Sequence, residues 1–477
     1  MYTECFILFD ECEKLVQDVH YRDSIREPMN DFFRFQNKAL ISATPIVPEK
    51  DSRFDGFMRV LIQPDYVYRH KLKLITTNNV LETLQEVIEA KRGTVCIFCN
   101  SIDSIDSFYR LIPELSNACT FCSEDGQYKL WKGNRRKKSM MITELERYNF
   151  FTSRFYSAVD IVCKNPPHVI LISDLYGATQ SVIDPATEAI QIIGRFRGGV
   201  NTVTHIASIR PDLECMSANE IDSWIEGAAS IFNGWKKQLA RTSNIGERTL
   251  LQEAIGENSY LPYLDANGKP DPFLIANLYE KEQVKRLYTS ADLLCNAYQQ
   301  TDYFAFSHEE RLMPVSDNER MAIQHRLAKK KRAELIVRKL EEMEKMSRAT
   351  DKKIQKRYQR MLMNLITSTA DRYIYDCFCR FGAKFVREAD YNENKLRTAL
   401  NVSSEHTIKK SGQMRTYIQR AFPVGAEISV QEAKSMLRQV YKKMGLNTGR
   451  GITTKELEQY AEIENSRNRE ARMIKIL

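Results

Sequence analysis

The sequence predicts an α/β protein, with a parallel sheet in the first half of the chain and mostly helices in the second half. From about residue 71 to about residue 208, short apolar runs alternate with amphipathic segments, which is typical of strands and helices that build a parallel sheet. Two earlier apolar runs, 5–9 and 38–44, end in acidic or small hydroxyl residues. After about residue 211, apolar residues recur at helical spacing. The chain therefore divides into a sheet-forming part and a mostly α-helical C-terminal region.

The composition is that of a globular protein of roughly two to four domains. Hydrophobic residues make up 43% of its 477 residues and charged residues 28%. No apolar run is long enough to span a bilayer, and the N-terminus lacks a signal-peptide pattern, so we expect no membrane association. The 11 cysteines are scattered through apolar segments, which suits reduced thiols in a cytoplasmic protein. The net charge of +8 favours a polyanionic partner.

The elements expected after residue 71 follow from the alternation of apolar and polar residues. Strands are predicted at 94–100, 118–123, 148–153, 168–173 and 202–208, and helices at 105–115 and 187–195. Since parallel strands bury both faces of their sheet, we expect helices to cover this sheet on both sides. The two earlier runs, 5–9 and 38–44, are also predicted to be buried parallel strands.

Three short motifs follow one another along the chain. The first two come after the early apolar runs, and the third lies on the helix expected at 187–195: Asp10-Glu11-Cys12-Glu13, Ser42-Ala43-Thr44-Pro45, and Gln191-Ile192-Ile193-Gly194-Arg195-Phe196-Arg197. Open parallel sheets bind ligands at the carboxyl ends of their strands, so the acidic residues are expected at a binding edge. Arginine suits a phosphate ligand because its planar guanidinium is permanently charged and donates several hydrogen bonds.

In this order the motifs resemble those of superfamily 2 helicases of the DEAD/DEAH-like type, over about residues 5–208. The resemblance implies a RecA-like helicase core that binds ATP and Mg²⁺, with a partial first domain at 1–70 and a complete second domain at 71–210. It assigns these residues to the nucleotide site: Asp10 as the metal ligand, Glu11 at the attacking water, Gln191, Arg195 and Arg197 at the phosphates, and Gly194 and Asp160 beside the nucleotide.

The resemblance also implies a nucleic-acid partner, DNA in the first instance and RNA as the alternative. Ser42 and Thr44 would couple the nucleotide to the nucleic-acid groove, and Thr152 would lie near the sugar-phosphate track. The basic loop at 129–138 contains one aromatic residue and suits a phosphate track with a stacked base, although a solvated loop explains it equally well. The candidate contacts are Ser42, Thr44, Ser101, Thr152, Trp131, Lys132, Arg135 and Arg136.

The sequence departs from the family pattern in three places. Ala158 stands where the family has glycine, and Arg197 comes one residue early, which turns its side chain by about 100° on a helix. Arg197 can therefore reach a phosphate only if the helix ends or tightens at Phe196; otherwise the arginine pair only complements the helix dipole. No Gly-x-x-x-x-Gly-Lys-Ser/Thr loop occurs in the chain. That Walker A loop would lie upstream of Met1 or come from a second polypeptide, or else the chain does not hydrolyse ATP.

Four cysteines have the spacing of a zinc ribbon. Cys96-x-x-Cys99 and Cys119-x-x-Cys122 both lie inside apolar runs, with no turn residue between the thiols. On a strand, residues i and i+3 face opposite sides of the sheet and cannot reach one metal ion. We therefore interpret these cysteines as core residues on neighbouring strands.

Beyond residue 211, the helical periodicity of the sequence predicts three regions: a helical domain at 211–315, a long basic helix or helical hairpin at 316–366, and a small helical module at 367–477. A hairpin is expected around the turn at 265–269, between 260–264 and 272–274. The basic helix is a candidate arm along a nucleic-acid backbone, or only a solvated face. The capping box Thr453-x-x-Glu456 and a short strand at 472–477 suggest a helix-turn-helix or winged module that binds nucleic acid.

Taken together, these features predict the C-terminal portion of an ATP-dependent DNA helicase or translocase, in the replication of a phage or mobile element. One alternative is a non-catalytic nucleic-acid-binding accessory protein, and another is an RNA helicase of the same superfamily. ATP turnover separates the first alternative from the prediction. Unwinding of matched DNA and RNA duplexes separates the second.

Overall fold

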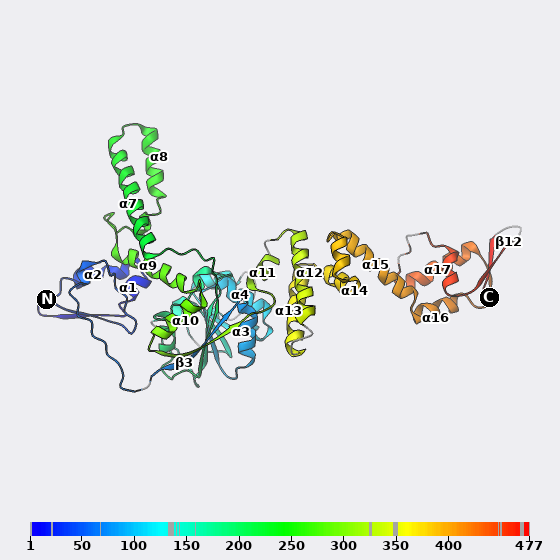
Figure 1. The fold of residues 1–477 in the computed structure, drawn as a ribbon, viewed down its shortest axis with the longest axis horizontal. Coiled ribbons are helices and arrows are strands. Elements are labelled where there is room, and N and C mark those ends of the chain that lie inside the picture. Colours follow the sequence, from blue (N-terminus) through cyan, green and yellow to red (C-terminus); the bar gives the residue numbers. More distant parts are fainter. Residues whose placement is uncertain are drawn as a thin grey trace. The chain divides into compact units, whose positions relative to one another are not determined.

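The computed structural model describes residues 2–20, 22–66, 68–131, 138–139, 141–142, 144–157, 159–323, 327–346, 352–446, 448, 451–467 and 472–476. The chain forms two compact units, Met1–Asn318 and Glu319–Leu477 (Figure 1). None of the described helices offers the stretch of apolar residues that a bilayer crossing requires.

The first unit is built on a parallel sheet, which confirms the predicted α/β class. Eight strands lie in the order β10-β3-β9-β8-β4-β7-β5-β6, and each pair of neighbours is parallel. Their bounds are His70–Thr77 (β3), Val95–Cys99 (β4), Cys119–Phe121 (β5), Lys138–Ser139 (β6), Tyr148–Phe151 (β7), His168–Ser173 (β8), Thr202–Ser208 (β9) and Phe304–Arg311 (β10). The strands predicted at 168–173 and 202–208 are found with the same ends.

Helices cover both faces of this sheet, as predicted. One hydrophobic core lies under α3 (Val80–Glu89), α4 (Ile102–Leu111) and α5 (Glu124–Trp131), and the other lies under α6 (Glu188–Gly194), α9 (Pro272–Leu287) and α10 (Ala291–Gln300). The four cysteines of the two Cys-x-x-Cys pairs divide between these cores. Cys96 and Cys119 belong to one core and Cys99 and Cys122 to the other, so each pair straddles the sheet as expected.

Strand β10 corrects the expectation of an all-helical stretch at 211–315. It pairs in parallel with β3 at the edge of the main sheet. Phe304 is buried and Phe306 packs against the same core, so the alternation of aromatic and small residues has the period of a strand. The hairpin expected at 260–274 is also wrong in its second arm, because Pro272 begins α9 with Asp271 as its N-cap.

Helices α9 and α10 are tied to the sheet by a buried polar cluster. His205 of β9 shares hydrogen bonds with Tyr298 (2.7 Å) and Ser173 (3.0 Å), and Tyr288 donates to the carbonyl of Ile183 at 2.6 Å. Burial lowers the pKa of His205 to about 3, so its ring is neutral at ordinary pH. Because every member of this cluster has a partner, it fixes one position of α9 on the sheet.

The N-terminal segment forms a small sheet of its own. Strands β1 (Phe6–Asp10) and β2 (Asn37–Ile41) are parallel, as predicted. Helices α1 (Lys14–Gln17) and α2 (Pro28–Phe32) form a core on one side of it, together with residues of α9. The prediction that both strands are buried is wrong for the other face, where Phe6 is 63% and Leu8 is 52% exposed. Since side chains alternate along a strand, Asp10 lies on that exposed face.

A helical hairpin follows the main sheet. Helix α7 (Ala218–Arg241) begins at the capping box of Ser217 and Glu220, and α8 (Ile245–Gly256) returns antiparallel to it. The two helices pack mainly on one another and project from the unit as an arm (Figure 1). Below, "the arm" denotes residues 217–257.

The second unit is helical with one small sheet. Helices α12 (Lys329–Met346) and α13 (Lys352–Ser368) pack as a helical hairpin, one of the two forms predicted for 316–366. The C-terminal module combines α16 (Gly412–Ala421) and α17 (Val430–Lys443) with strands Glu427–Ser429 (β11), Ile463–Arg467 (β12) and Arg472–Ile476 (β13). These strands are antiparallel in the order β11-β13-β12, so the predicted strand at 472–477 is confirmed, as is the capping box of Thr453 and Glu456.

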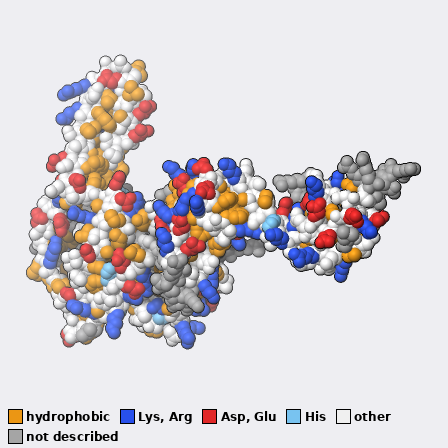
Figure 2. All heavy atoms as spheres, turned by 45° about the vertical axis from the view of Figure 1, so that its right-hand side comes forward, with side chains coloured by type: hydrophobic (Ala, Val, Ile, Leu, Met, Phe, Trp, Pro, Cys, Tyr) orange, Lys and Arg blue, Asp and Glu red, His pale blue; other side chains and the backbone are white. Residues whose placement is uncertain are grey.

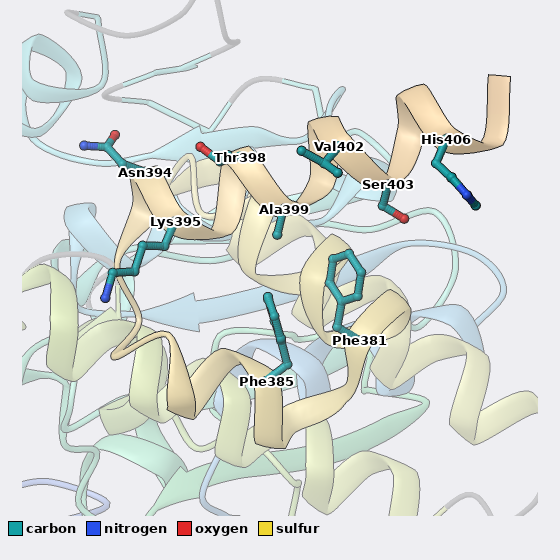
Figure 3. A pocket seen from close by; sticks show the side chains of 9 residues that line it. All are labelled: Phe381, Phe385, Asn394, Lys395, Thr398, Ala399, Val402, Ser403 and His406. Carbon is teal, nitrogen blue, oxygen red and sulfur yellow. The ribbon is translucent and has the colours of Figure 1, made fainter. Parts of the chain in front are cut away.

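Between α14 (Arg372–Glu388) and α15 (Glu393–Lys409) lies an open, mainly apolar groove of about 750 Å³. Phe381 and Phe385 of α14 face Ala399 and Val402 of α15 across it (Figure 3). Gly382 breaks α14 at this point with φ +80° and ψ 167°, a conformation that glycine adopts readily and other residues do not. The kink therefore shapes one wall of the groove.

Candidate functional site

The first motif lies at the carboxyl end of β1, where the prediction placed it. The Asp10 side chain is exposed and its Oδ1 accepts a hydrogen bond from the Glu11 backbone N–H at 2.9 Å. Glu11 has a φ of +53°, in the left-handed region that costs a non-glycine residue about 1–3 kcal/mol. Strain of this kind persists only where the surrounding structure holds it, and it is frequent at functional sites.

Helix α6 brings the third motif onto the first two. The Gln191 side-chain amide donates to Glu13 Oε1 at 3.1 Å and to Thr44 Oγ1 at 2.9 Å. All three residues are at least 95% buried, since their exposed fractions are 5% for Gln191, 0% for Glu13 and 5% for Thr44. Burial raises the pKa of Glu13, whereas a hydrogen bond from Ser42 lowers it. One glutamine thus joins residues that lie up to 178 positions away in sequence.

Arg195 lies at the end of α6 and faces the first motif. Its Nε donates to the Gln191 backbone carbonyl at 3.1 Å and its Nη2 to the Gln191 side-chain oxygen at 3.2 Å. Its Nη1 lies 3.9 Å from Glu11 Oε1, which is an ion-pair contact too long for a hydrogen bond. Gln191 therefore fixes one side of the guanidinium and leaves the other side directed toward Glu11.

The helix tightens before Arg197, which is the condition for this side chain to reach a phosphate, but the side chain pairs with Asp160 instead. The helix tightens after Gly194, because the N–H groups of Arg195 and Phe196 bond to carbonyls three residues back. Arg197 is exposed and pairs with Asp160 at 3.0 Å. Asp160 is thus adjacent to the third motif, and the Ile161 N–H donates to the Arg195 carbonyl at 2.9 Å. A side chain at Gly194 would meet no atom within 4 Å, so the space beside it is open.

The candidate nucleic-acid residues fall into three groups. Ser42 and Thr44 join the site, and the Ser42 hydroxyl accepts from the Thr44 N–H at 2.9 Å. Ser101 and Thr152 follow β4 and β7, which are neighbours in the sheet, and so they share its carboxyl edge. Ser101 also caps α4. The third group lies outside the described residues: the side chain of Trp131, all of Lys132, Arg135 and Arg136, and the family-pattern position Ala158.

Three carboxyl groups lie where α1, α6 and α9 meet. Gln17 of α1 donates to Glu280 Oε1 (3.0 Å) and to Thr187 Oγ1 (3.1 Å), directly before α6. Thr187 donates to Asp184 at 2.7 Å, and Glu188 accepts from the Asp184 N–H at 3.0 Å. Desolvation raises the pKa of Glu188 to about 8 and that of Glu280 to about 7. This cluster links the N-terminal segment to the helix that carries Arg195.

Replacing Glu188 by glutamine is expected to make the stability of the first unit less dependent on pH. The pKa of Glu188 is about 8 in the folded protein and near 4.5 when the chain unfolds. The contribution of Glu188 to the free energy of unfolding is therefore complete below about pH 4.5. This contribution is lost as the pH rises to about 8, by at most about 1.4 kcal/mol per pH unit. Urea denaturation at several pH values between these limits measures the effect. The exposed Glu226→Gln is the control, and parallel curves for E188Q and wild type would contradict the prediction.

The sequence did not single out Glu13, although the structure makes it a centre of the site. It lies in the Asp10-Glu11-Cys12-Glu13 string, and its burial beside a glutamine from α6 becomes visible only in the fold. Its second oxygen, Oε2, is buried and has no hydrogen-bond partner among the residues that the structure describes. The sequence offered one signal, since Glu13 is the third acidic residue within four positions after an apolar run.

Asp10 offers an exposed carboxylate at the end of β1. Among the residues that the structure describes, no group of three or more His, Cys, Asp or Glu side chains could hold a metal ion by itself. In nucleotide sites, Mg²⁺ is held by one or two carboxylates together with phosphate oxygens and water, and Asp10 is a carboxylate that could take this part.

A comparison of the sequence with models of known protein families finds no match, and a comparison with curated proteins finds none either.

Proposed function

We propose that this chain acts as a superfamily 2 helicase or translocase that is driven by ATP and acts on DNA. The observation that carries the proposal is the convergence of the three motifs on one place. Gln191 bonds to both Glu13 and Thr44, and Arg195 lies 3.9 Å from Glu11. Acidic groups at a strand end and an arginine from a neighbouring sheet are what a triphosphate bound between them requires. The parallel sheet with helices on both faces supports a RecA-like core.

In this proposal each residue of the site has one task. Asp10 would hold Mg²⁺, which would neutralise phosphate charge when it is bound with ATP. Glu11 orients and polarises the attacking water, and its strained backbone keeps the carboxylate at the strand end. Arg195 stabilises the charge that spreads over the transferring phosphoryl group, and Gln191 positions that arginine.

We propose that the same contacts couple nucleotide hydrolysis to the movement of nucleic acid. Glu13, Gln191, Thr44 and Ser42 form one chain of hydrogen bonds from α6 to the ends of β1 and β2. Loss of the γ-phosphate would remove the ligand that draws Arg195 toward Glu11, and the two parts would separate. Repeated closing and opening would move one DNA strand along the cleft, past the carboxyl edge that carries Ser101 and Thr152.

ATP turnover tests the proposal most simply. We expect Mg²⁺-dependent hydrolysis by the purified chain, and we expect DNA to stimulate it. Unwinding of matched DNA and RNA duplexes then assigns the substrate. A chain that binds nucleic acid but hydrolyses no ATP would contradict the proposal and favour the non-catalytic accessory protein.

A further inference from the structure

The arm of α7 and α8 has almost no share in the core of the first unit. Helix α7 has 24 residues, of which Ile221 and Phe232 are buried, and none of the 12 residues of α8 is buried. At about 1.5 Å per residue, α7 alone is about 36 Å long. Two paired helices that project so far expose most of their surface to solvent (Figure 1). Their outer residues are therefore available for binding another molecule.

Charge is distributed unevenly along the arm. Its outer half, residues 231–254, contains four basic residues and two acidic residues, a formal net charge of +2. Its inner half, residues 217–230 and 255–257, contains four acidic residues and no basic ones, a formal net charge of −4. Figure 2 shows Lys and Arg side chains standing out from the upper part of the arm. The end of the arm farthest from the sheet is thus its cationic end.

Several charged groups of the arm have partners within the protein, whereas the side chains of two of its four cations have no ion pair, hydrogen bond or ring contact in the described structure. Near the base, Asp222 pairs with Lys50, and at the tip the Glu247 carboxylate accepts hydrogen bonds from Thr242 and Gln238. In the described part of the chain, Lys237 and Arg241 have no ion pair and are exposed. They are four residues apart on α7 and therefore lie on one face of the helix, with their Cβ atoms about 5–6 Å apart.

The side chains around Lys237 and Arg241 are better suited to contact with the phosphate backbone of a nucleic acid than to contact with unpaired bases. Phe232 is buried and Trp235 is half-buried, so neither offers the exposed aromatic face on which single-stranded bases stack. The most exposed apolar residue at the tip is aliphatic: Ile245 is 82% exposed. Two rigid helices with a cationic face and no stacking platform suit the phosphates of a double helix.

We propose that the outer half of the arm, through Lys237 and Arg241, binds the phosphate backbone of duplex DNA. The choice of DNA as the polyanion rests on the proposed function, whereas the electrostatic argument stands without it. Residues 258–271 connect the arm to α9, which contacts α1 through the Asn277 amide and the Val16 carbonyl at 2.8 Å. A duplex held by the arm would therefore be connected to the segment that carries Asp10 and Glu11.

The test is equilibrium binding of the full chain to a fluorescein-labelled DNA duplex of about 30 base pairs, followed by anisotropy at several salt concentrations. For the Lys237→Ala/Arg241→Ala variant we expect about 10-fold weaker binding or more, and a salt dependence (the slope of log K against log salt concentration) smaller by about 2. The control is Arg92→Ala/Lys164→Ala, which removes the same charge before β4 and β8, at the opposite edge of the sheet from the candidate site. The control should bind within about 2-fold of wild type.

Other results would overturn the inference. Unchanged affinity and slope in K237A/R241A would do so, and so would a loss confined to single-stranded DNA or to an RNA duplex. The melting temperature of the variant should equal that of the wild type because both side chains are exposed and without ion pairs in the described structure. If the wild-type chain hydrolyses no ATP but K237A/R241A binds duplex DNA more weakly than the wild type, the inference about the arm holds and the proposed motor function fails.

Discussion

Replacing Arg195 by alanine is expected to lower the rate of ATP hydrolysis by about 10³-fold or more, the effect of removing an arginine that stabilises a phosphoryl-transfer transition state. Arg195 is 92% buried and is held by two hydrogen bonds to Gln191, so its guanidinium is pre-positioned toward Glu11. Lysine should restore little of the rate, since a point charge cannot bond to Gln191 and to a phosphate in the same geometry. Steady-state phosphate release at saturating ATP and DNA measures the change.

Arg197→Ala is the matched control for this prediction. Arg197 lies two residues away, is exposed and pairs with Asp160 rather than with the first motif. We expect its loss to change the rate by less than about 10-fold, with an unchanged melting temperature. Equal losses in R195A and R197A would contradict the assignment of Arg195, because the structure separates the surroundings of the two side chains.

Replacing Gln191 by leucine is expected to lower the free energy of unfolding of the first unit by about 2–3 kcal/mol. The substitution keeps a side chain of similar size on α6 but removes the donor to Glu13 and Thr44, which are both buried. Glu13 already has one carboxylate oxygen without a hydrogen-bond partner among the described residues, so the loss of Gln191 leaves a second buried oxygen without this donor. Urea denaturation followed by far-UV circular dichroism measures the loss.

A double-mutant cycle with Glu13 tests the origin of that loss. Glu13→Leu removes the acceptor, and the double variant removes both groups, so the coupling energy between positions 13 and 191 should be about 1 kcal/mol or more. The exposed pair Arg69 and Asp302 serves as the control, for which we expect a coupling of about 0–1 kcal/mol. Additive effects at positions 13 and 191 would show that α6 does not hold the N-terminal segment through this contact.

The sequence predicted five of the eight strands described in the main sheet, because these five are short apolar runs flanked by turn residues. Strands β3, β6 and β10 were not predicted. Strands β8 and β9 were found with the predicted ends, and the two Cys-x-x-Cys pairs divide between the two faces of the sheet. Strand β10 was missed because Phe304-Ala305-Phe306 follows directly on two helices, and its partner β3 lies more than 200 residues earlier. Local pattern identifies a strand, but it does not identify a distant partner.

The candidate site was predicted in its parts but not in its connections. The ends of β1 and α6 follow from local motifs, and Asp10, Glu11 and Arg195 were named on that basis. Glu13 was not, since its function depends on burial against Gln191, which only the packing of α6 on the N-terminal segment creates. The prediction that the strands at 5–9 and 38–44 are buried was wrong for one face of their sheet, because a run of apolar residues does not show which face is covered.

A crystal structure of the chain with Mg²⁺ and a non-hydrolysable ATP analogue tests the central claim most directly. The proposed function places the triphosphate between the end of β1 and the end of α6. It predicts the metal ion on Asp10 and a γ-phosphate oxygen within hydrogen-bond distance of Arg195. An analogue bound elsewhere, or Asp10 and Arg195 on surfaces that do not face one another around it, would contradict the claim.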